Sequence, residues 1–193
     1  MRSMMAGMGH FHYARHFSLL GAATLVLFLF GQWDLLNDSL IASFAINGAL
    51  HASGLALTLR SPCSKLRKFM FIAIAASLSI FTLYVGILGL VLFAGARGNE
   101  RLHLVLGLCS LSGAITYASL IRIYWIRRLS SRRILAISFL CLLATSLAFF
   151  AKIRADFLGG WWLAAAWWFA FSGGLWFFDT HADSLRQSKY TGA

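Results

Sequence analysis

One histidine stands among polar side chains on a single face of the second apolar segment of the chain. Asn47 lies four residues before His51 and Thr58 lies seven residues after it, so all three share one stripe of a helix. Ser110 and Tyr117 share the corresponding stripe of the fourth apolar segment. A histidine inside a membrane helix is able to sense pH or to relay protons. These five residues are candidates for lining a polar pathway; the structural alternative is a hydrogen bond from His51 to Ser110 or to a carbonyl group.

The other histidines are weaker candidates for chemistry. His10, His12 and His16 form an HxHxxxH pattern that is able to chelate a divalent metal, but no carboxylate or thiolate lies near them in sequence. Axial ligation of a haem needs two histidines at similar depth on facing helices. His51 is deep, whereas His103 is close to one surface and His16 to the other. We therefore predict neither a bis-histidine haem site nor a metal site, and no cofactor.

Catalytic motifs are lacking in this sequence. It has no nucleotide-binding loop, zinc-protease pattern or nucleophile elbow, and the three cysteines include no CxxC pair. Trp167 and Trp168 lie within an apolar segment, where core packing or lipid contact is the alternative to a pigment or quinone site. We predict that the chain is not an enzyme.

The composition requires a membrane. Sixty per cent of the residues are hydrophobic, 12% are charged and the mean hydropathy is +0.75, far from the values of soluble domains. A membrane helix needs roughly 20 apolar residues, and six runs of about that length predict an all-α, polytopic protein with six transmembrane helices. The runs are 17–33, 40–59, 69–94, 102–124, 134–151 and 157–178.

Basic residues predict the orientation of these spans. With the N-terminus inside, 13 of the 17 lysines and arginines fall on the inner side, which predicts cytoplasmic N- and C-termini in a bacterial inner membrane. Only Arg97, Arg101, Lys152 and Arg154 remain outside. The net charge of +11 sits in short connectors, so anionic inner-leaflet headgroups are the expected partners and nucleic acid is not.

A Ser-Gly pair recurs in the second half of three apolar segments, at steps of 59 and 60 residues. The pairs are Ser53-Gly54, Ser112-Gly113 and Ser172-Gly173. Small residues let membrane helices approach closely. We predict that the even-numbered helices meet at these six positions, and that one helical hairpin is repeated three times in the same orientation.

These predictions define one membrane domain at residues 16–181. Its hairpin repeats are expected at about 16–61, 68–127 and 133–181, with cytoplasmic tails at 1–15 and 182–193.

Three tandem hairpins with Ser-Gly second helices and basic inner links, such as LIRIYWIRR at 120–128, resemble the HdeD-like family of small bacterial inner-membrane proteins. The resemblance implies a six-span protein linked to membrane stress or acid tolerance, and it implies no catalytic residues. Two other functions remain open from the residues: a small-solute or proton pathway through the bundle, and an accessory subunit of a larger membrane complex. Partners would then be a second copy of the chain or another membrane protein.

Overall fold

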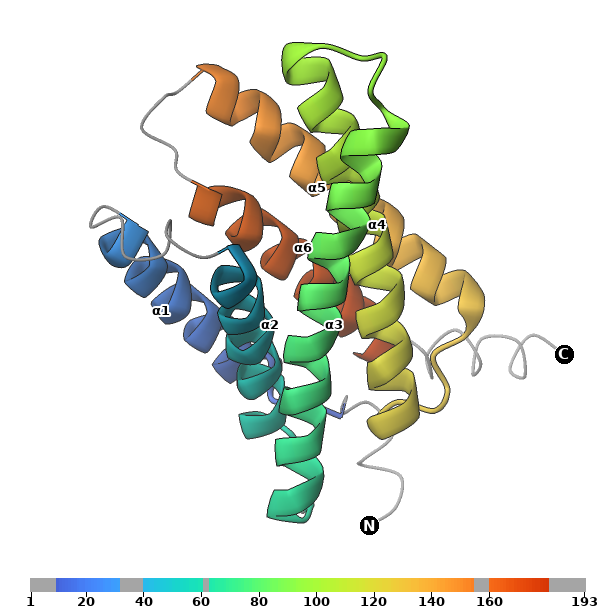
Figure 1. Cartoon of the computed structure of the whole chain (residues 1–193). Coiled ribbons are helices and arrows are strands. Elements are labelled where there is room, and N and C mark those ends of the chain that lie inside the picture. The colour runs from blue at the N-terminus through green and yellow to red at the C-terminus, as the bar shows by residue number, and fades with distance from the viewer. Residues whose placement is uncertain (1–9, 32–39, 61–62, 155–159, 181–193) are drawn as a thin grey trace, which may run out of the picture.

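The computed structural model describes residues 10–31, 40–60, 63–154 and 160–180, which form an all-helical bundle (Figure 1). The predicted all-α class is confirmed for these residues. The six helices are α1 (Tyr13–Gly31), α2 (Leu40–Leu57), α3 (Lys65–Leu92), α4 (Gly98–Tyr124), α5 (Ser131–Arg154) and α6 (Gly160–Thr180).

Helices α3, α4 and α5 are long and apolar enough to cross a membrane, and the described part of α2, Phe44–Leu57, is a shorter apolar helix. Local sequence sets the ends of α3 and α4. Ser64 caps α3, where its hydroxyl accepts a hydrogen bond from the Arg67 N–H at 3.2 Å. Gly98 has a φ of +54°, a conformation that glycine adopts at low cost, and α4 starts at this residue.

The helices follow one another around the bundle. Helices α2 to α6 pack chiefly on their neighbours in sequence, whereas α1 packs chiefly on α6, which returns to lie against it (Figure 1). Large side chains from α2, α4 and α6 reach the centre, where Tyr117 and Phe171 lie 5.2 Å apart and Trp167 stacks on Phe171 at 5.0 Å between ring centroids. The even-numbered helices therefore meet through bulky rings.

The three predicted packing glycines have different surroundings. A Cβ on Gly54 would stand 3.3 Å from Nδ1 of His16 in α1, and one on Gly113 would stand 3.5 Å from Thr82 in α3. A Cβ on Gly173 would have no atom within 4 Å among the described residues. The Cβ on Gly113 would also lie 3.8 Å from the Trp167 ring of α6, so an even-numbered helix is near only one of these three glycines among the described residues. That the even-numbered helices meet at all six positions stays a prediction.

The serines of the pairs also differ. Ser53 is half-buried, and the Ser112 hydroxyl donates to the Cys109 carbonyl of its own helix at 3.2 Å. Ser172 is fully buried and is bonded to two histidines, described below. The sixty-residue hairpin repeat stays a prediction.

We expect Gly54→Ala to destabilise the protein by about 1 kcal/mol, because the added methyl group presses on a His16 ring that is already held by hydrogen bonding. Gly173→Ala is the matched change without a neighbour, and the gain in helix propensity should make it neutral or stabilising by up to about 1 kcal/mol. Equilibrium unfolding of the two variants in mild detergent measures the difference. Equal effects would contradict the different surroundings of these glycines.

The described part of the predicted tail 1–15 packs into the bundle instead of extending from it. Phe11 is 0% exposed and forms an isolated antiparallel bridge with Leu59. The His12 N–H donates to the Thr58 carbonyl at 2.8 Å, and the Arg60 N–H donates to the His10 carbonyl at 3.0 Å. A buried phenylalanine explains the difference, since its aromatic ring gains more from the core than from water.

Candidate functional site

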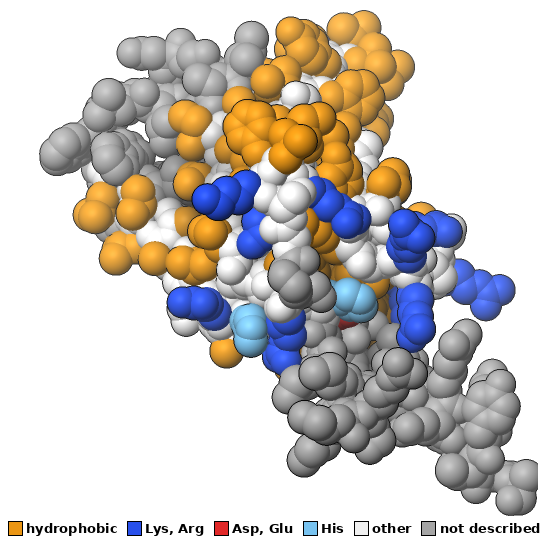
Figure 2. Space-filling view, turned by 90° about the horizontal axis from the view of Figure 1, so that it is seen from below, with side chains coloured by type: hydrophobic (Ala, Val, Ile, Leu, Met, Phe, Trp, Pro, Cys, Tyr) orange, Lys and Arg blue, Asp and Glu red, His pale blue; other side chains and the backbone are white. Residues whose placement is uncertain are grey.

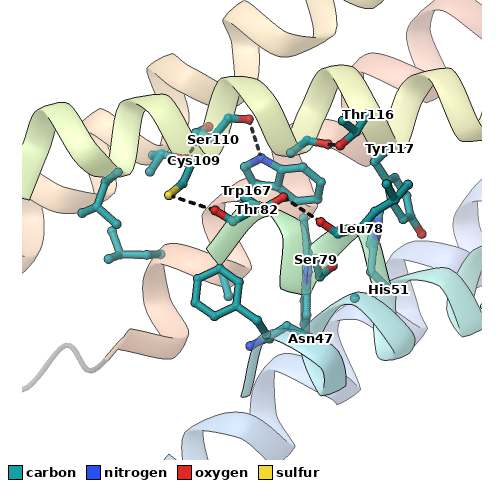
Figure 3. A pocket seen from close by; sticks show the side chains of 18 residues that line it. Asn47, His51, Leu78, Ser79, Thr82, Cys109, Ser110, Thr116, Tyr117 and Trp167 are labelled. Atoms are coloured by element: carbon teal, nitrogen blue, oxygen red, sulfur yellow. Dashed lines mark hydrogen bonds between the residues drawn. The ribbon is translucent and has the colours of Figure 1, made fainter. Parts of the chain in front are cut away.

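A cavity of about 310 Å³ lies between α2, α3, α4, α5 and α6 (Figure 3). Its wall is mostly apolar, with aromatic rings and several hydroxyl groups. The lining residues include Phe44, Asn47, His51, Ser79, Thr82, Ser110, Thr116, Tyr117, Thr145, Ala164, Trp167 and Trp168.

Aromatic rings surround His51 at one end of this cavity. The imidazole stacks nearly parallel on Trp168, with 6.1 Å between centroids, and lies 5.1 Å from Tyr117. Trp167 and Phe171 meet it edge to face at 5.8 and 5.6 Å. His51 is only 1% exposed, so the packing of these rings fixes its position.

Most hydroxyl groups on the cavity wall are satisfied within the protein. Ser79 and Thr82 each donate to the carbonyl four residues earlier in α3, at 3.0 Å. Ser110 and Thr145 share a hydrogen bond of 3.1 Å between α4 and α5, and the Trp167 indole donates to the Ser110 carbonyl at 3.3 Å. These groups therefore shape the wall and bind its helices together.

Two buried polar atoms on residues of the cavity wall differ from the others. Nδ1 of His51 and the hydroxyl oxygen of Tyr117 make no hydrogen bond to any residue in the described ranges. An unsatisfied buried group of this kind costs about 1–3 kcal/mol. Unpaired buried atoms of this kind occur at sites where a bound molecule supplies the missing hydrogen-bond partner.

A second histidine lies directly behind His51. Nε2 of His16 and Nε2 of His51 both lie within hydrogen-bond distance of the Ser172 hydroxyl, at 2.9 and 3.1 Å, and the two ring centroids are 5.7 Å apart. The prediction that no two histidines share a depth is therefore wrong. Because α2 ends at Leu57, His51 lies only about 9 Å from that end of its helix, and His16 is about 4.5 Å from the adjacent start of α1.

The two histidine rings meet edge to face at 5.7 Å, and the Ser172 side chain, which is 0% exposed, bonds Nε2 of both. This arrangement does not fit a haem, whose ring would have to lie where Ser172 bonds both imidazoles. The HxHxxxH residues do not converge on a metal either: His10 binds Asp179, His12 is exposed and His16 is buried. Among the described residues, no three candidate ligands group together.

Four of the five predicted pathway residues line the cavity: Asn47, His51, Ser110 and Tyr117. Thr58 is not part of the wall. Its buried hydroxyl donates to the Gly54 carbonyl at 2.8 Å, one turn earlier in α2. Helical spacing thus grouped four residues of α2 and α4 that line one cavity, and Thr58 lies outside its wall. That these residues form a pathway stays a prediction.

Asp179, at the end of α6, holds the N-terminal segment in place. Its side chain is 1% exposed and accepts hydrogen bonds from the His10 N–H and from the Tyr13 hydroxyl, at 2.5 and 2.8 Å. The His10 ring pairs with the same carboxylate. Burial and the adjacent carboxylate raise the pKa of Tyr13, which precedes the apolar run, so its hydroxyl remains a donor.

No family model, curated protein or solved structure matches this chain. The resemblance to the HdeD-like family stays a prediction, and the cavity must be interpreted from its own geometry. Sequence reasoning missed Ser172 as the partner of two histidines and Asp179 as a buried acceptor. The HxHxxxH pattern signalled His16, but no local pattern pointed to its partners, which lie more than 150 residues away.

Proposed function

We propose that this chain is a non-catalytic, multi-pass inner-membrane protein that binds a small, uncharged and largely apolar molecule in the central cavity. The observation that carries the proposal is the pairing of an apolar 310 Å³ cavity with two unsatisfied polar atoms, on His51 and Tyr117. Ligand sites of proteins have this composition, and the volume lies at the lower end of their range.

The wall favours a ring-shaped occupant over a lipid tail. Trp167, Trp168, Phe44 and Tyr117 present aromatic surfaces, which pack well against another ring. A cavity of about 150 Å³ holds one benzene molecule, so twice that volume accepts two fused rings. An acyl chain has no polar group to satisfy the buried atoms of His51 and Tyr117.

The proposal includes six membrane spans with both termini in the cytoplasm. Figure 2 views the end of the bundle where α1 begins and α2 and α4 end, and it shows Lys and Arg side chains around that end. The contributing residues are Arg15, Arg60, Lys65, Arg67, Lys68, Arg122, Arg127, Arg128, Arg132 and Arg133. This distribution supports a cytoplasmic location of that end, in contact with anionic headgroups.

Tight packing below the cavity supports binding over passage of a solute. Many side chains toward the basic end of the bundle from His51 are fully buried aromatic and aliphatic groups. They include Leu55, Phe71, Ile121, Phe171 and Leu175, each 0% exposed. The solute pathway, the role in stress or acid tolerance and the role as a complex subunit stay predictions, since no contact in the described residues favours them over ligand binding.

Filling the cavity should abolish binding. We expect indene, an uncharged two-ring hydrocarbon, to raise the unfolding temperature of the protein in lipid nanodiscs, because a ligand at 100 times its dissociation constant stabilises by about 2.7 kcal/mol. In Ala164→Phe, a phenyl group on the cavity wall takes up the space, and this stabilisation should fall below about a tenth of its wild-type value.

Ala136→Phe is the matched control, because Ala136 lies on the exposed face of α5 and the same substitution leaves the cavity open. Both variants experience the same partitioning of indene into lipid. If indene stabilises all three proteins equally, the cavity is not its binding site. If indene stabilises none of them, the cavity does not bind small apolar rings, and the proposal fails.

A further inference from the structure

Three residues from three helices form a buried hydrogen-bonded bridge behind the cavity: His16 of α1, Ser172 of α6 and His51 of α2. Their exposed fractions are 0, 0 and 1%. His51 also lines the cavity, whereas His16 does not. The bridge therefore connects the proposed binding site to a residue outside it.

Proton counting restricts this bridge to two arrangements. The Ser172 hydroxyl carries one proton and bonds no acceptor outside the bridge among the described residues, so it donates to one histidine Nε2 and accepts from the other. The two imidazoles must then differ: one carries its proton on Nε2 and the other carries it on Nδ1. Both are expected to be neutral, because the rings that contact them carry no formal charge. Besides each other, at 5.7 Å between centroids, His51 meets Tyr117, Trp167, Trp168 and Phe171, and His16 meets the ring of Phe17.

We propose, on the basis of the proposed function, that the cavity binds uncharged, two-ring compounds carrying one hydrogen-bonding group. The His51–Ser172–His16 bridge then switches its proton positions to match a donor or an acceptor on the bound compound. Nδ1 of His51 is the atom that bonds the compound, here called the reading atom, since His51 lines the cavity and this nitrogen has no partner among the described residues. A donor or an acceptor in the cavity selects the opposite proton arrangement throughout the bridge.

An acceptor such as a carbonyl selects His51 with its proton on Nδ1. Ser172 then donates to Nε2 of His51, and His16 donates its Nε2 proton to Ser172. A donor such as a pyrrole N–H selects the reverse: His51 donates from Nε2 to Ser172, which donates to Nε2 of His16, and the His16 proton resides on Nδ1, facing Gly54. Both arrangements hold the same number of protons, and exchange with water during loading suffices to interconvert them.

Three probes of nearly equal size test this inference. Indene has no hydrogen-bonding group, 1-indanone has only an acceptor and indole has only a donor. After correction for partitioning into lipid, we expect 1-indanone and indole to bind about fivefold more tightly than indene, the effect of one net hydrogen bond. Equal affinities of all three would overturn the inference and leave the proposed binding function intact.

Nitrogen-15 NMR of labelled histidines measures the switch directly, with the His16 signals assigned from a His16→Gln variant. With 1-indanone, His16 should carry its proton on Nε2; with indole, on Nδ1. His16 touches no ligand, so a merely structural role predicts the same His16 spectrum in both complexes. An unchanged His16 spectrum with both probes bound contradicts the switch.

Two variants separate the bridge from the cavity. Ser172→Ala should still bind indene but should remove the His16 response. Ser119→Ala deletes an exposed hydroxyl that bonds only the Ile115 carbonyl of its own helix, and it should retain the response. If Ser172→Ala fails to fold, His51→Phe serves in its place, since it keeps a ring of similar size and removes the reading atom. A His16 response that persists in either bridge variant overturns the inference. Failure of every probe to bind the wild type overturns the proposed function and the inference together.

Discussion

Replacing Gly48 by alanine is expected to destabilise the bundle by about 1–3 kcal/mol, the typical cost of inserting a group into a packed interface. A Cβ at this position would lie 2.8 Å from the Ser79 Cβ and 2.9 Å from the Ala75 carbonyl oxygen of α3. Because a carbonyl oxygen is part of the helix backbone, it cannot rotate away as a flexible side chain does. The two helices must separate, and the cavity that Gly48 and Ser79 line should change shape.

Gly21→Ala is the control for this prediction, since Gly21 is exposed on α1 and a Cβ there would have no atom within 4 Å. It should be neutral or stabilising by up to about 1 kcal/mol, from helix propensity alone. Chemical unfolding in detergent measures both variants, and indene binding measures the cavity. A Gly48→Ala protein as stable as the wild type would contradict the close approach of α2 and α3.

Removing the buried carboxylate of Asp179 should have the second large effect. Asp179→Ala leaves the Tyr13 hydroxyl and the His10 N–H without their acceptor, and we expect a loss of about 2–3 kcal/mol. Residues 10–12 should then detach from residues 58–60. The His12 and Arg60 amides bond between residues 10–12 and 58–60. Their hydrogen exchange is expected to accelerate in the variant.

A graded series controls the Asp179 experiment. Tyr13→Phe removes one of the donors and should cost about 1 kcal/mol, with a smaller rise in exchange. Arg122→Ala removes an exposed charge at the same end of the bundle and should stay within about 0.5 kcal/mol of the wild type. If the His12 amide is still protected from hydrogen exchange in Asp179→Ala, the pairing of residues 10–12 with residues 58–60 does not depend on this carboxylate.

Properties that repeat along one helix were predictable from the sequence. Hydropathy predicted six helical segments, and the three-four spacing placed Asn47 and His51 of α2 on the cavity wall. Ser110 and Tyr117 of α4 followed from the same spacing. Periodicity succeeds here because it depends only on the 3.6-residue turn of a helix.

Contacts between distant helices were not predictable in the same way. The depth estimate separated His16 from His51 because it measured position from the ends of apolar runs, whereas α2 ends at Leu57 and brings His51 near the start of α1. Ser172 looked like a packing residue because its repeat partners are Ser53 and Ser112. Its actual role depends on α6 returning to α1, which no spacing within one segment indicates.

The return of α6 to α1 has a consequence for biosynthesis. Ser172, Trp168 and Asp179 all belong to α6, which leaves the ribosome after the other five described helices. Neither the histidine pair nor the contact of Asp179 with Tyr13 can therefore form before α6 has been made. Until α6 is made, His16 of α1 lacks its hydrogen-bonding partner Ser172. A chain truncated before α6 would expose these polar groups to lipid, and cellular quality control would have a chemical feature by which to recognise the unfinished product.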